Sequence, residues 1–356
     1  MLNTVVFLDQ LIGNGIEKII GVPCSFLGGL INEAENRGMY EPFINEGDAL
    51  AYAAGAALAG KKCAVVMQSS GLTNAISPLT SLNELFGLHT LLIIGNRGVD
   101  DEPQHRIMAN VLAPILKTLE IPFFDAEMPN AVAMAFEHLT QHSTAILVSD
   151  RNTLDKTALI VRKGPQAPQV WPLRSEYLRV VADCAENAVI ITSTGFTSRE
   201  MFCIQDRPEN FYMVGSMGCL SSLASGIADY FPNRPIIAID GDSACLMRLG
   251  ALYTVTQKQP HNLCYIVLDN EANESTGGQR NSLGASRLLE VMNSMHSTDC
   301  VDSPSAMSCT LRKFLRTKSY MQIYAKIRIG SARDLPRPDR QLIYEQARRF
   351  RAAVTK

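Results

Sequence analysis

The chain has 356 residues, of which 46% are hydrophobic and 19% are charged, and its formal net charge is −2 at pH 7. This length and composition allow two domains with buried cores and exclude a largely disordered chain. The small net charge gives no electrostatic basis for binding nucleic acid or an anionic membrane, and we expect neither as a partner.

The cysteines and the N-terminus indicate a cytoplasmic protein. The nine cysteines form no Cys-x-x-Cys pair, and several lie in apolar segments, which favours reduced thiols. The N-terminus lacks a basic region and Asp9 interrupts its short apolar run, so we expect a first helix there rather than a signal peptide. The sequence contains no uninterrupted apolar stretch of about 18 residues that could span a bilayer.

Short apolar segments alternate with helical segments in two series. The first series predicts strands at residues 19–22, 63–67, 90–94 and 144–148, with helices such as 49–59 and 110–119 between them. The second predicts strands at 189–192, 235–240, 263–268 and 319–329. Strands that alternate with helices are typical of parallel α/β sheets, so we expect two such sheets.

A Pro-rich passage separates the two series. Residues 163–172 form the longest Pro-rich stretch of the chain, which is typical of an extended linker. We therefore expect a first domain over residues 1–160, a linker over 161–175 and a second domain over 176–356.

Oxygen-bearing side chains follow two strands of the second series. Asp242 follows the strand 235–240, and Asn270 follows the strand 263–268, with a helical segment between them. A strand–helix–strand unit is almost always a right-handed parallel crossover, which places Asp242 and Asn270 at one carboxyl edge. These side chains and the carbonyl of Ala272 are hard oxygen ligands of the kind that Mg²⁺ prefers when it also binds phosphate. The pattern favours a magnesium-held diphosphate, and strand-end capping is the alternative.

Several motifs carry a family resemblance. Gly241-Asp242-Ser243, followed after 26 intervening residues by Asn270, resembles the thiamine diphosphate fingerprint, Gly-Asp-Gly with a distant Asn. The run 268–279 resembles the segment that follows this fingerprint in phosphonopyruvate decarboxylases. Further matches occur in the expected order at 45–47, 70–82, 101–105, 194–200 and 215–218. The chain thus resembles the thiamine diphosphate-dependent decarboxylases of the phosphonopyruvate and sulfopyruvate branch.

The resemblance implies an architecture and an activity. It implies an α/β fold with two parallel-sheet domains, the first binding the pyrimidine and the second the diphosphate of thiamine diphosphate, without a central third domain. It also implies Mg²⁺, a homodimer or larger homo-oligomer with active sites between subunits, and decarboxylation of 3-phosphonopyruvate to phosphonoacetaldehyde and carbon dioxide in phosphonate biosynthesis. Sulfopyruvate decarboxylation, carboligation and a catalytically silent regulatory paralogue are the open alternatives.

Glu46 is the main catalytic candidate. The resemblance implies that Glu46 hydrogen-bonds the aminopyrimidine and so promotes deprotonation of the thiazolium carbon. A carboxylate in an apolar setting holds its proton more tightly, which suits proton exchange with a ring nitrogen near neutral pH. An ordinary acidic residue at a helix N-terminus is the alternative.

The cofactor candidates are spread over both series. The proposed Mg²⁺ ligands are Asp242, Asn270 and the carbonyl of Ala272. The complete set of expected cofactor-binding residues is Glu46, Ser70, Gly71, Thr194, Gly195, Thr197, Ser198, Gly215, Ser216, Met217, Gly241, Asp242, Ser243, Asn270 and Ala272. For the residues around Thr194 the alternative is a strand-to-helix cap, and for Met217 it is an ordinary core position.

The anionic substrate needs cationic groups or several hydrogen-bond donors. Arg97, His105 and Arg106 cluster after the carboxyl end of an expected strand. Arginine binds such an anion with two donors, and His105 would bind it or transfer the proton that forms the product. Solvated ion pairs with the neighbouring acidic residues are the alternative. Ser25 and Thr276 complete the substrate candidates.

Three positions depart from the family pattern. Ser243 replaces the second Gly of the fingerprint, Cys24 replaces an Asp, and Cys219 stands where relatives often have His. If position 243 required a positive φ, Ser would cost about 1–2 kcal/mol there. Its hydroxyl, however, would donate to a diphosphate oxygen, so we expect cofactor binding to survive.

Overall fold

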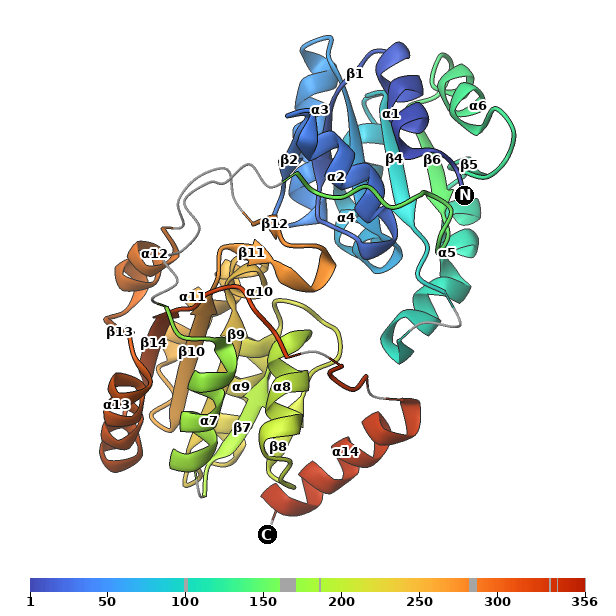
Figure 1. The fold of residues 1–356 in the computed structure, drawn as a ribbon. Coiled ribbons are helices and arrows are strands. Elements are labelled where there is room, and N and C mark those ends of the chain that lie inside the picture. The colour runs from blue at the N-terminus through green and yellow to red at the C-terminus, as the bar shows by residue number, and fades with distance from the viewer. Residues whose placement is uncertain are drawn as a thin grey trace. The chain divides into compact units, whose positions relative to one another are not determined.

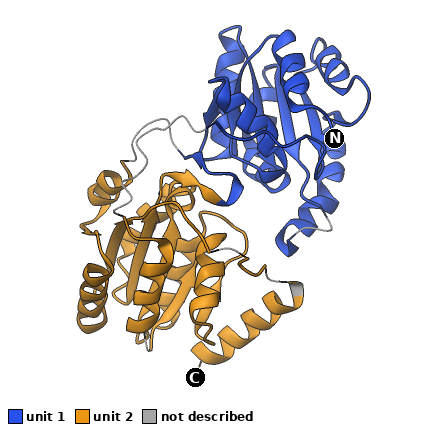
Figure 2. Ribbon diagram, in the orientation of Figure 1, with its two compact units in different colours: residues 1–162, 275–283 blue, residues 163–274, 284–356 orange. Residues whose placement is uncertain are grey.

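The computed structural model describes residues 1–98, 102–160, 171–185, 187–281, 287–332, 334–337 and 339–355. The chain divides into two compact units, residues 1–162 with 275–283 and residues 163–274 with 284–356 (Figure 2). Each unit contains a six-stranded sheet (Figure 1). Most of the expected linker, residues 161–170, lies outside the described residues, and the domain boundaries stay a prediction.

The first unit has a parallel sheet of order β2-β1-β3-β4-β6-β5. Its strands are β1 (Ile16–Gly21), β2 (Tyr40–Pro42), β3 (Lys62–Gln68), β4 (Thr90–Gly95), β5 (Phe123–Asp125) and β6 (Thr144–Ser149). Its helices are α1 (Thr4–Gly13), α2 (Gly28–Asn36), α3 (Glu46–Leu58), α4 (Leu72–Pro78), α5 (Arg106–Thr118) and α6 (Ala131–His138). Short helical turns are η1 (Ser25–Leu27), η2 (Ser69–Gly71), η3 (Leu79–Glu84) and η4 (Pro103–His105).

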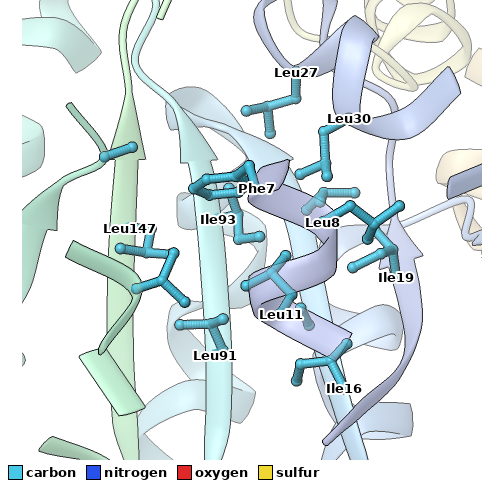
Figure 3. Close-up of a cluster of buried hydrophobic side chains, with 14 of the residues drawn as sticks. Phe7, Leu8, Leu11, Ile16, Ile19, Leu27, Leu30, Leu91, Ile93 and Leu147 are labelled. Carbon is cyan, nitrogen blue, oxygen red and sulfur yellow. The ribbon is translucent and has the colours of Figure 1, made fainter. Parts of the chain in front are cut away.

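Both faces of this first sheet are covered. Alternate residues of one strand enter opposite cores, as Leu91 and Leu92 of β4 do, because successive side chains of a strand point to opposite faces. Figure 3 shows the first of these cores, in which Leu8 and Leu11 of α1 pack against the sheet beside Ile19 and Ile93. Burial on both faces explains why the central strands are continuously apolar.

The second unit has a parallel sheet of order β13-β14-β10-β9-β7-β8. Its strands are β7 (Val189–Thr192), β8 (Asn210–Tyr212), β9 (Ile236–Gly241), β10 (Leu263–Asp269), β13 (Thr298–Val301) and β14 (Met321–Lys326). Its helices are α7 (Arg174–Cys184), α8 (Phe196–Ile204), α9 (Leu220–Tyr230), α10 (Asp242–Met247), α11 (Leu249–Lys258), α12 (Leu288–Met295), α13 (Pro304–Thr317) and α14 (Arg340–Val354). The short β11 (Ala272–Asn273), η5 (Glu274–Thr276) and β12 (Gln279–Arg280) follow β10.

Helices also cover both faces of the second sheet. On one face, α7, α8 and α13 contribute side chains to the core that contains Ile237 and Ile266. On the other, α9, α11, α12 and α14 pack over Ala238 and Val267. Within the described residues, no helix has both the length and the apolar character needed to cross a membrane.

The central strands expected for both sheets are confirmed. The structure differs from the expected elements at a strand end, within one helix and at the edge strands. The expected strand 319–329 is shorter, because β14 covers only Met321–Lys326. The expected single helix 244–259 is divided at Arg248, whose backbone has φ −134° and ψ 53°. The edge strands β2 and β8 have three residues each, which is too short for a periodic apolar pattern to reveal.

Candidate active site

Glu46 lies buried at the start of α3. Its side chain is only 2% exposed. The helix begins there because the side chain of Asn45 accepts a hydrogen bond from the backbone N–H of Gly47 at 2.8 Å. The Glu46 carboxylate accepts a hydrogen bond from Asn74 of α4, with Nδ2 lying 2.8 Å from Oε2. The helix therefore begins three residues before the expected bounds 49–59 and includes Glu46, and the amide of Asn74 orients the carboxylate.

Two glycines allow this close packing. A Cβ atom added at Gly71 would lie 2.5 Å from Glu46 Oε1, and one added at Gly47 would lie 2.8 Å from the carbonyl oxygen of Asn74. Both distances are too short for any other residue without displacing its neighbours. Glu46, Gly71 and Asn74 therefore form one tightly packed cradle, in which the carboxylate depends on the absence of a side chain at position 71.

The ends of β9 and β10 lie side by side in the second unit. The two strands are parallel, and Gly241 is in register with Leu268. Asp242 directly follows β9 and begins α10, and Asn270 directly follows β10. Asp242 is 4% exposed and Asn270 is 8% exposed. The crossover argument therefore placed both residues correctly at one carboxyl edge.

Asp242 has a carboxylate neighbour that the sequence argument did not include. Its carboxyl group hydrogen-bonds that of Asp269, the last residue of β10. Burial and the nearby charge of Asp269 raise the pKa of Asp242 well above its ordinary value. Burial opposes ionisation of Asp269 too, but the hydrogen bonds from Asp242 and Tyr324 outweigh it and lower the pKa of Asp269. The electrostatics of the pair therefore favour the protonated form of Asp242 and the ionised form of Asp269.

This donor set fits a divalent cation bound mainly by oxygen atoms. Two buried carboxyl groups in contact favour positive charge beside them; Lys326 Nζ lies 3.5 Å from Asp269 Oδ2, and a metal ion would supply such a charge at Asp242. Among the described residues there is no cluster of three or more His, Cys, Asp or Glu side chains suited to a metal. A mixed set of one carboxylate, one carboxamide and one backbone carbonyl does not require such a cluster, and it suits Mg²⁺.

Ser243 lies in the first turn of α10 and has a helical rather than a left-handed backbone. The conformational free energy that a positive φ would cost Ser at this position is therefore not incurred. Its Oγ is buried and has no hydrogen-bond partner in the described part of the chain. A buried hydroxyl without a partner is costly, and a diphosphate oxygen at the helix N-terminus would accept its hydrogen bond.

The segments 194–198 and 215–218 supply backbone turns with unusual conformations. Gly195 has φ 87° just before α8, and Ser216 has φ 54°, which is strained for a residue other than glycine. The hydroxyl of Ser198 donates to the carbonyl oxygen of Ser193 at 2.7 Å, and no side chain that the structure describes caps α8 at its N-cap residue, Gly195. Thr197 is buried, whereas Thr194, Gly215 and Met217 are half-buried.

The substrate candidates of the first unit differ in exposure. His105 is 6% exposed, and its Nε2 lies 4.0 Å from Glu102 Oε2. Ser25 and Arg106 are exposed, and Ser70 and Thr276 are half-buried. The guanidinium carbon of Arg97 lies 5.3 Å from the ring centroid of Phe26, and that of Arg151 lies 5.4 Å from the same centroid.

Sequence reasoning missed several residues at these positions. Arg151 occurs two residues after β6 and Arg97 two residues after β4, and Gly95 and Ser149 are paired in register at the ends of these strands. Because Arg97 and Arg151 each stand two residues after neighbouring parallel strands, their spacing in the sequence would have indicated that they lie at the same edge of the sheet. Asn74 lay inside a motif that we quoted, but its contact with Glu46 joins residues 28 positions apart. Asp269 was interpreted only as the end of a strand.

Comparison with known proteins identifies the family. Residues 4–113 match the N-terminal, and residues 193–336 the C-terminal, TPP binding domain of thiamine pyrophosphate enzymes. Phosphonopyruvate decarboxylases from Streptomyces viridochromogenes and Streptomyces hygroscopicus are each 34% identical, and the alignments cover 100% of this chain and 96% and 94% of theirs. A sulfopyruvate decarboxylase from Methanosarcina acetivorans is 26% identical over 90% of this chain and 91% of its own.

Some relatives are divided between two chains. The alpha and beta subunits of the sulfopyruvate decarboxylase from Methanocaldococcus jannaschii match 36% and 34% of this chain, and the alignments cover 79% and 64% of those subunits. The two sheets, the two matched domains and the full-length relatives confirm the resemblance. The chain belongs to the thiamine pyrophosphate-dependent enzymes, in the family of the phosphonopyruvate decarboxylases.

Proposed function

We propose that the protein catalyses the thiamine diphosphate- and Mg²⁺-dependent decarboxylation of 3-phosphonopyruvate to phosphonoacetaldehyde and carbon dioxide, as a step of phosphonate biosynthesis. The observation that carries the proposal is 34% identity, over the whole chain, with two phosphonopyruvate decarboxylases. The position of Asp242 and Asn270 at one carboxyl edge supports it, because open α/β sheets bind ligands at that edge.

In the second unit, Asp242, Asn270 and the carbonyl of Ala272 would hold Mg²⁺. Ser243 would donate its hydroxyl proton to a diphosphate oxygen, since its Oγ has no other partner in the described chain. The turns 194–198 and 215–218 would supply further donors and, through Met217, an apolar contact with the cofactor. All of these contacts bind and orient, which is the contribution a protein makes to cofactor chemistry.

In the first unit, Glu46 would exchange a proton with a nitrogen of the aminopyrimidine, supported by Ser70 and Gly71. Asn74 donates to Oε2 of this carboxylate, and the absence of a side chain at Gly71 leaves room beside Oε1. Thiamine diphosphate, when bound, supplies the nucleophilic carbon and the electron sink that accepts electrons as carbon dioxide leaves.

Arg97 and Arg151 support an anionic substrate. A phosphonate carries up to two negative charges, whereas a sulfonate carries one. The guanidinium groups of both arginines lie near the ring of Phe26 and would provide positive charge and donors for a phosphonate dianion. His105 would bind the substrate or transfer the product-forming proton, with Ser25, Arg106 and Thr276 at the margin of the site. The 26% identical relative keeps sulfopyruvate as the second candidate substrate.

We also infer a cytoplasmic homodimer or larger homo-oligomer with active sites between subunits. The family resemblance supports the oligomer, and all nine cysteines are free, which suits a reducing compartment. The proposed domains are residues 1–160 and 176–356 with a linker over 161–175, close to the division of the chain into compact units.

The experiment that tests the proposal compares three substrates. Purified protein is incubated with Mg²⁺ and thiamine diphosphate and offered phosphonopyruvate, sulfopyruvate or pyruvate, while carbon dioxide and aldehyde are quantified. We expect fast turnover of phosphonopyruvate and little of the others. Preferential turnover of sulfopyruvate would show that sulfopyruvate rather than phosphonopyruvate is the substrate. A product that joins the substrate fragment to a second carbonyl compound would indicate carboligation.

A further inference from the structure

A buried arginine lies beside the candidate metal-binding loop. Arg174 is the first residue of α7 and is only 5% exposed. Its Nη2 lies 2.6 Å from Glu274 Oε2, and its Nη1 lies 3.4 Å from Glu200 Oε1. Arginine is almost never buried to this degree without a carboxylate partner. The two carboxylates therefore hold Arg174 in place, and Arg174 holds them.

Glu274 connects this arginine to Asn270. The same Oε2 that accepts from Arg174 also accepts a hydrogen bond from Asn270 Nδ2 at 3.1 Å. The other oxygen, Oε1, accepts from the backbone N–H of Gly330 at 3.0 Å. Because both oxygens are bonded, the Glu274 carboxylate has a fixed position and a fixed orientation.

The carboxylate determines which way the Asn270 carboxamide faces. The two ends of a carboxamide have nearly the same shape, but only the nitrogen end donates hydrogen bonds. An ionised carboxylate accepts and does not donate, so the nitrogen end must face Glu274. The oxygen end then faces the opposite side, where Oδ1 lies 3.1 Å from the backbone nitrogen of Ala272. This Oδ1 is the atom assigned to Mg²⁺.

We infer that Arg174 and Glu274 are positioning residues, which orient Asn270 so that its oxygen rather than its nitrogen faces the metal ion. The inference rests on the proposed function, because it concerns the same Mg²⁺ site. Groups that orient metal ligands from behind typically change metal affinity by about 10–100-fold when they are replaced. Neither residue was among the candidates that the sequence indicated.

The deciding variant is Glu274→Gln. Glutamine has nearly the same shape but only one oxygen and no charge, so it cannot accept from Gly330 on one side and from Arg174 and Asn270 on the other, and it holds Asn270 less firmly. We expect the Mg²⁺ dissociation constant, measured by calorimetric titration of the full chain in the presence of thiamine diphosphate, to rise at least about tenfold. An unchanged dissociation constant would overturn the inference.

Arg174→Met tests the more distant residue, and Arg199→Met is its matched control. Both arginines lie about 5.5 Å from the ring centroid of Phe196. Arg199, however, donates to the carbonyl oxygens of Leu335 and Pro336 rather than to Glu274. We expect Arg174→Met to weaken Mg²⁺ binding and Arg199→Met to leave it within about twofold of the wild type. Equal losses in both variants would contradict a specific role.

A double variant and an unfolding measurement separate positioning from stability. If Arg174 acts through Glu274, the losses of Mg²⁺ affinity will not add in Arg174→Met/Glu274→Gln. A purely structural role would lower the unfolding midpoint of the metal-free protein and leave the Mg²⁺ affinity of the folded protein unchanged. Where Arg174→Met does not fold, Glu274→Gln decides alone.

The same titration distinguishes two kinds of failure. If the wild-type protein binds no Mg²⁺ in the presence of thiamine diphosphate, the proposed function and the inference fail together. If the wild type binds Mg²⁺ and Glu274→Gln binds it equally well, only the inference fails and the proposed function stands.

Discussion

Each unit of the chain buries a carboxylate at its candidate site, but the two carboxylates have opposite surroundings. Glu46 of the first unit is 2% exposed and accepts a hydrogen bond from a neutral amide, Asn74. Asp242 of the second unit is 4% exposed and contacts a second carboxyl group, Asp269. Equal burial therefore accompanies two different electrostatic environments.

The difference indicates what each carboxylate can do. The amide of Asn74 orients the Glu46 carboxylate without adding a charge of its own. Two carboxyl groups in contact instead favour the arrival of a cation between or beside them. If the proposed function is correct, Glu46 of the first unit exchanges a proton and Asp242 of the second binds a metal ion. The exposed fractions of the two side chains alone do not distinguish these roles.

The largest expected effect follows from replacing the carboxylate that exchanges protons. Glu46→Gln keeps the shape of the side chain and the contact with Asn74 but removes the ionisable group. We expect kcat to fall by about 10²–10⁴-fold, the range typical of general acid–base groups, with Mg²⁺ affinity nearly unchanged. Steady-state kinetics and a parallel Mg²⁺ titration measure both, and full activity would contradict the assignment.

The cradle around Glu46 is tested by Gly71→Ala. The new Cβ would lie 2.5 Å from Glu46 Oε1 and must displace the carboxylate. A displacement of about 1 Å can cost about 10²-fold in rate, so we expect kcat to fall between tenfold and a hundredfold. Gly55→Ala in α3 is the control, because no atom lies within 4 Å of its added Cβ. Equal activity of both variants would show that the cradle does not position Glu46.

Asp242→Asn tests the metal side of the comparison. An amide in place of the carboxyl group donates to Asp269 without adding a second negative charge. We expect the metal-free protein to become more stable, by on the order of 1 kcal/mol, while the stabilisation by Mg²⁺ and thiamine diphosphate disappears. Thermal unfolding with and without both ligands measures the two effects. A ligand-induced shift equal to that of the wild type would contradict the Mg²⁺ assignment.

The smallest expected effect concerns a third buried carboxylate, Glu200. Burial raises its pKa above the ordinary value of 4.5, although the charge of Arg174 opposes the shift. Folding therefore favours the protonated form, and this stabilisation is complete below pH 4.5 and lost as the pH rises through the folded pKa. We expect the free energy of unfolding to fall as the pH rises through this range. Denaturant unfolding between pH 4 and 7 measures it, and Glu200→Gln should remove this dependence.

The sequence predicted what depends on local pattern and on the handedness of parallel crossovers. The strand β7 was predicted with its observed bounds, and Asp242 and Asn270 were placed correctly at one edge. Contacts between distant segments were not predictable in this way. The bond between Arg174 and Glu274 joins residues 100 positions apart, and no periodicity of either segment indicates it.

The same limit applies to exposure and charge environment. Apolar runs indicate which strands are buried, but they do not show that the carboxyl groups of Asp269 and Asp242 are neighbours, because that depends on the register of β9 and β10. Similarly, no pattern in the sequence around Glu46 shows that Gly71 is the residue in contact with its carboxylate.

The helical backbone of Ser243 has a consequence for how such proteins are recognised. A glycine is indispensable only where the main chain has a conformation that other residues avoid, and position 243 is the second residue of an ordinary helix. Many small residues should therefore be tolerated there over evolutionary time. A search that demands the letters Gly-Asp-Gly would discard this chain, whereas one that demands a strand end, an aspartate and a helix start would retain it.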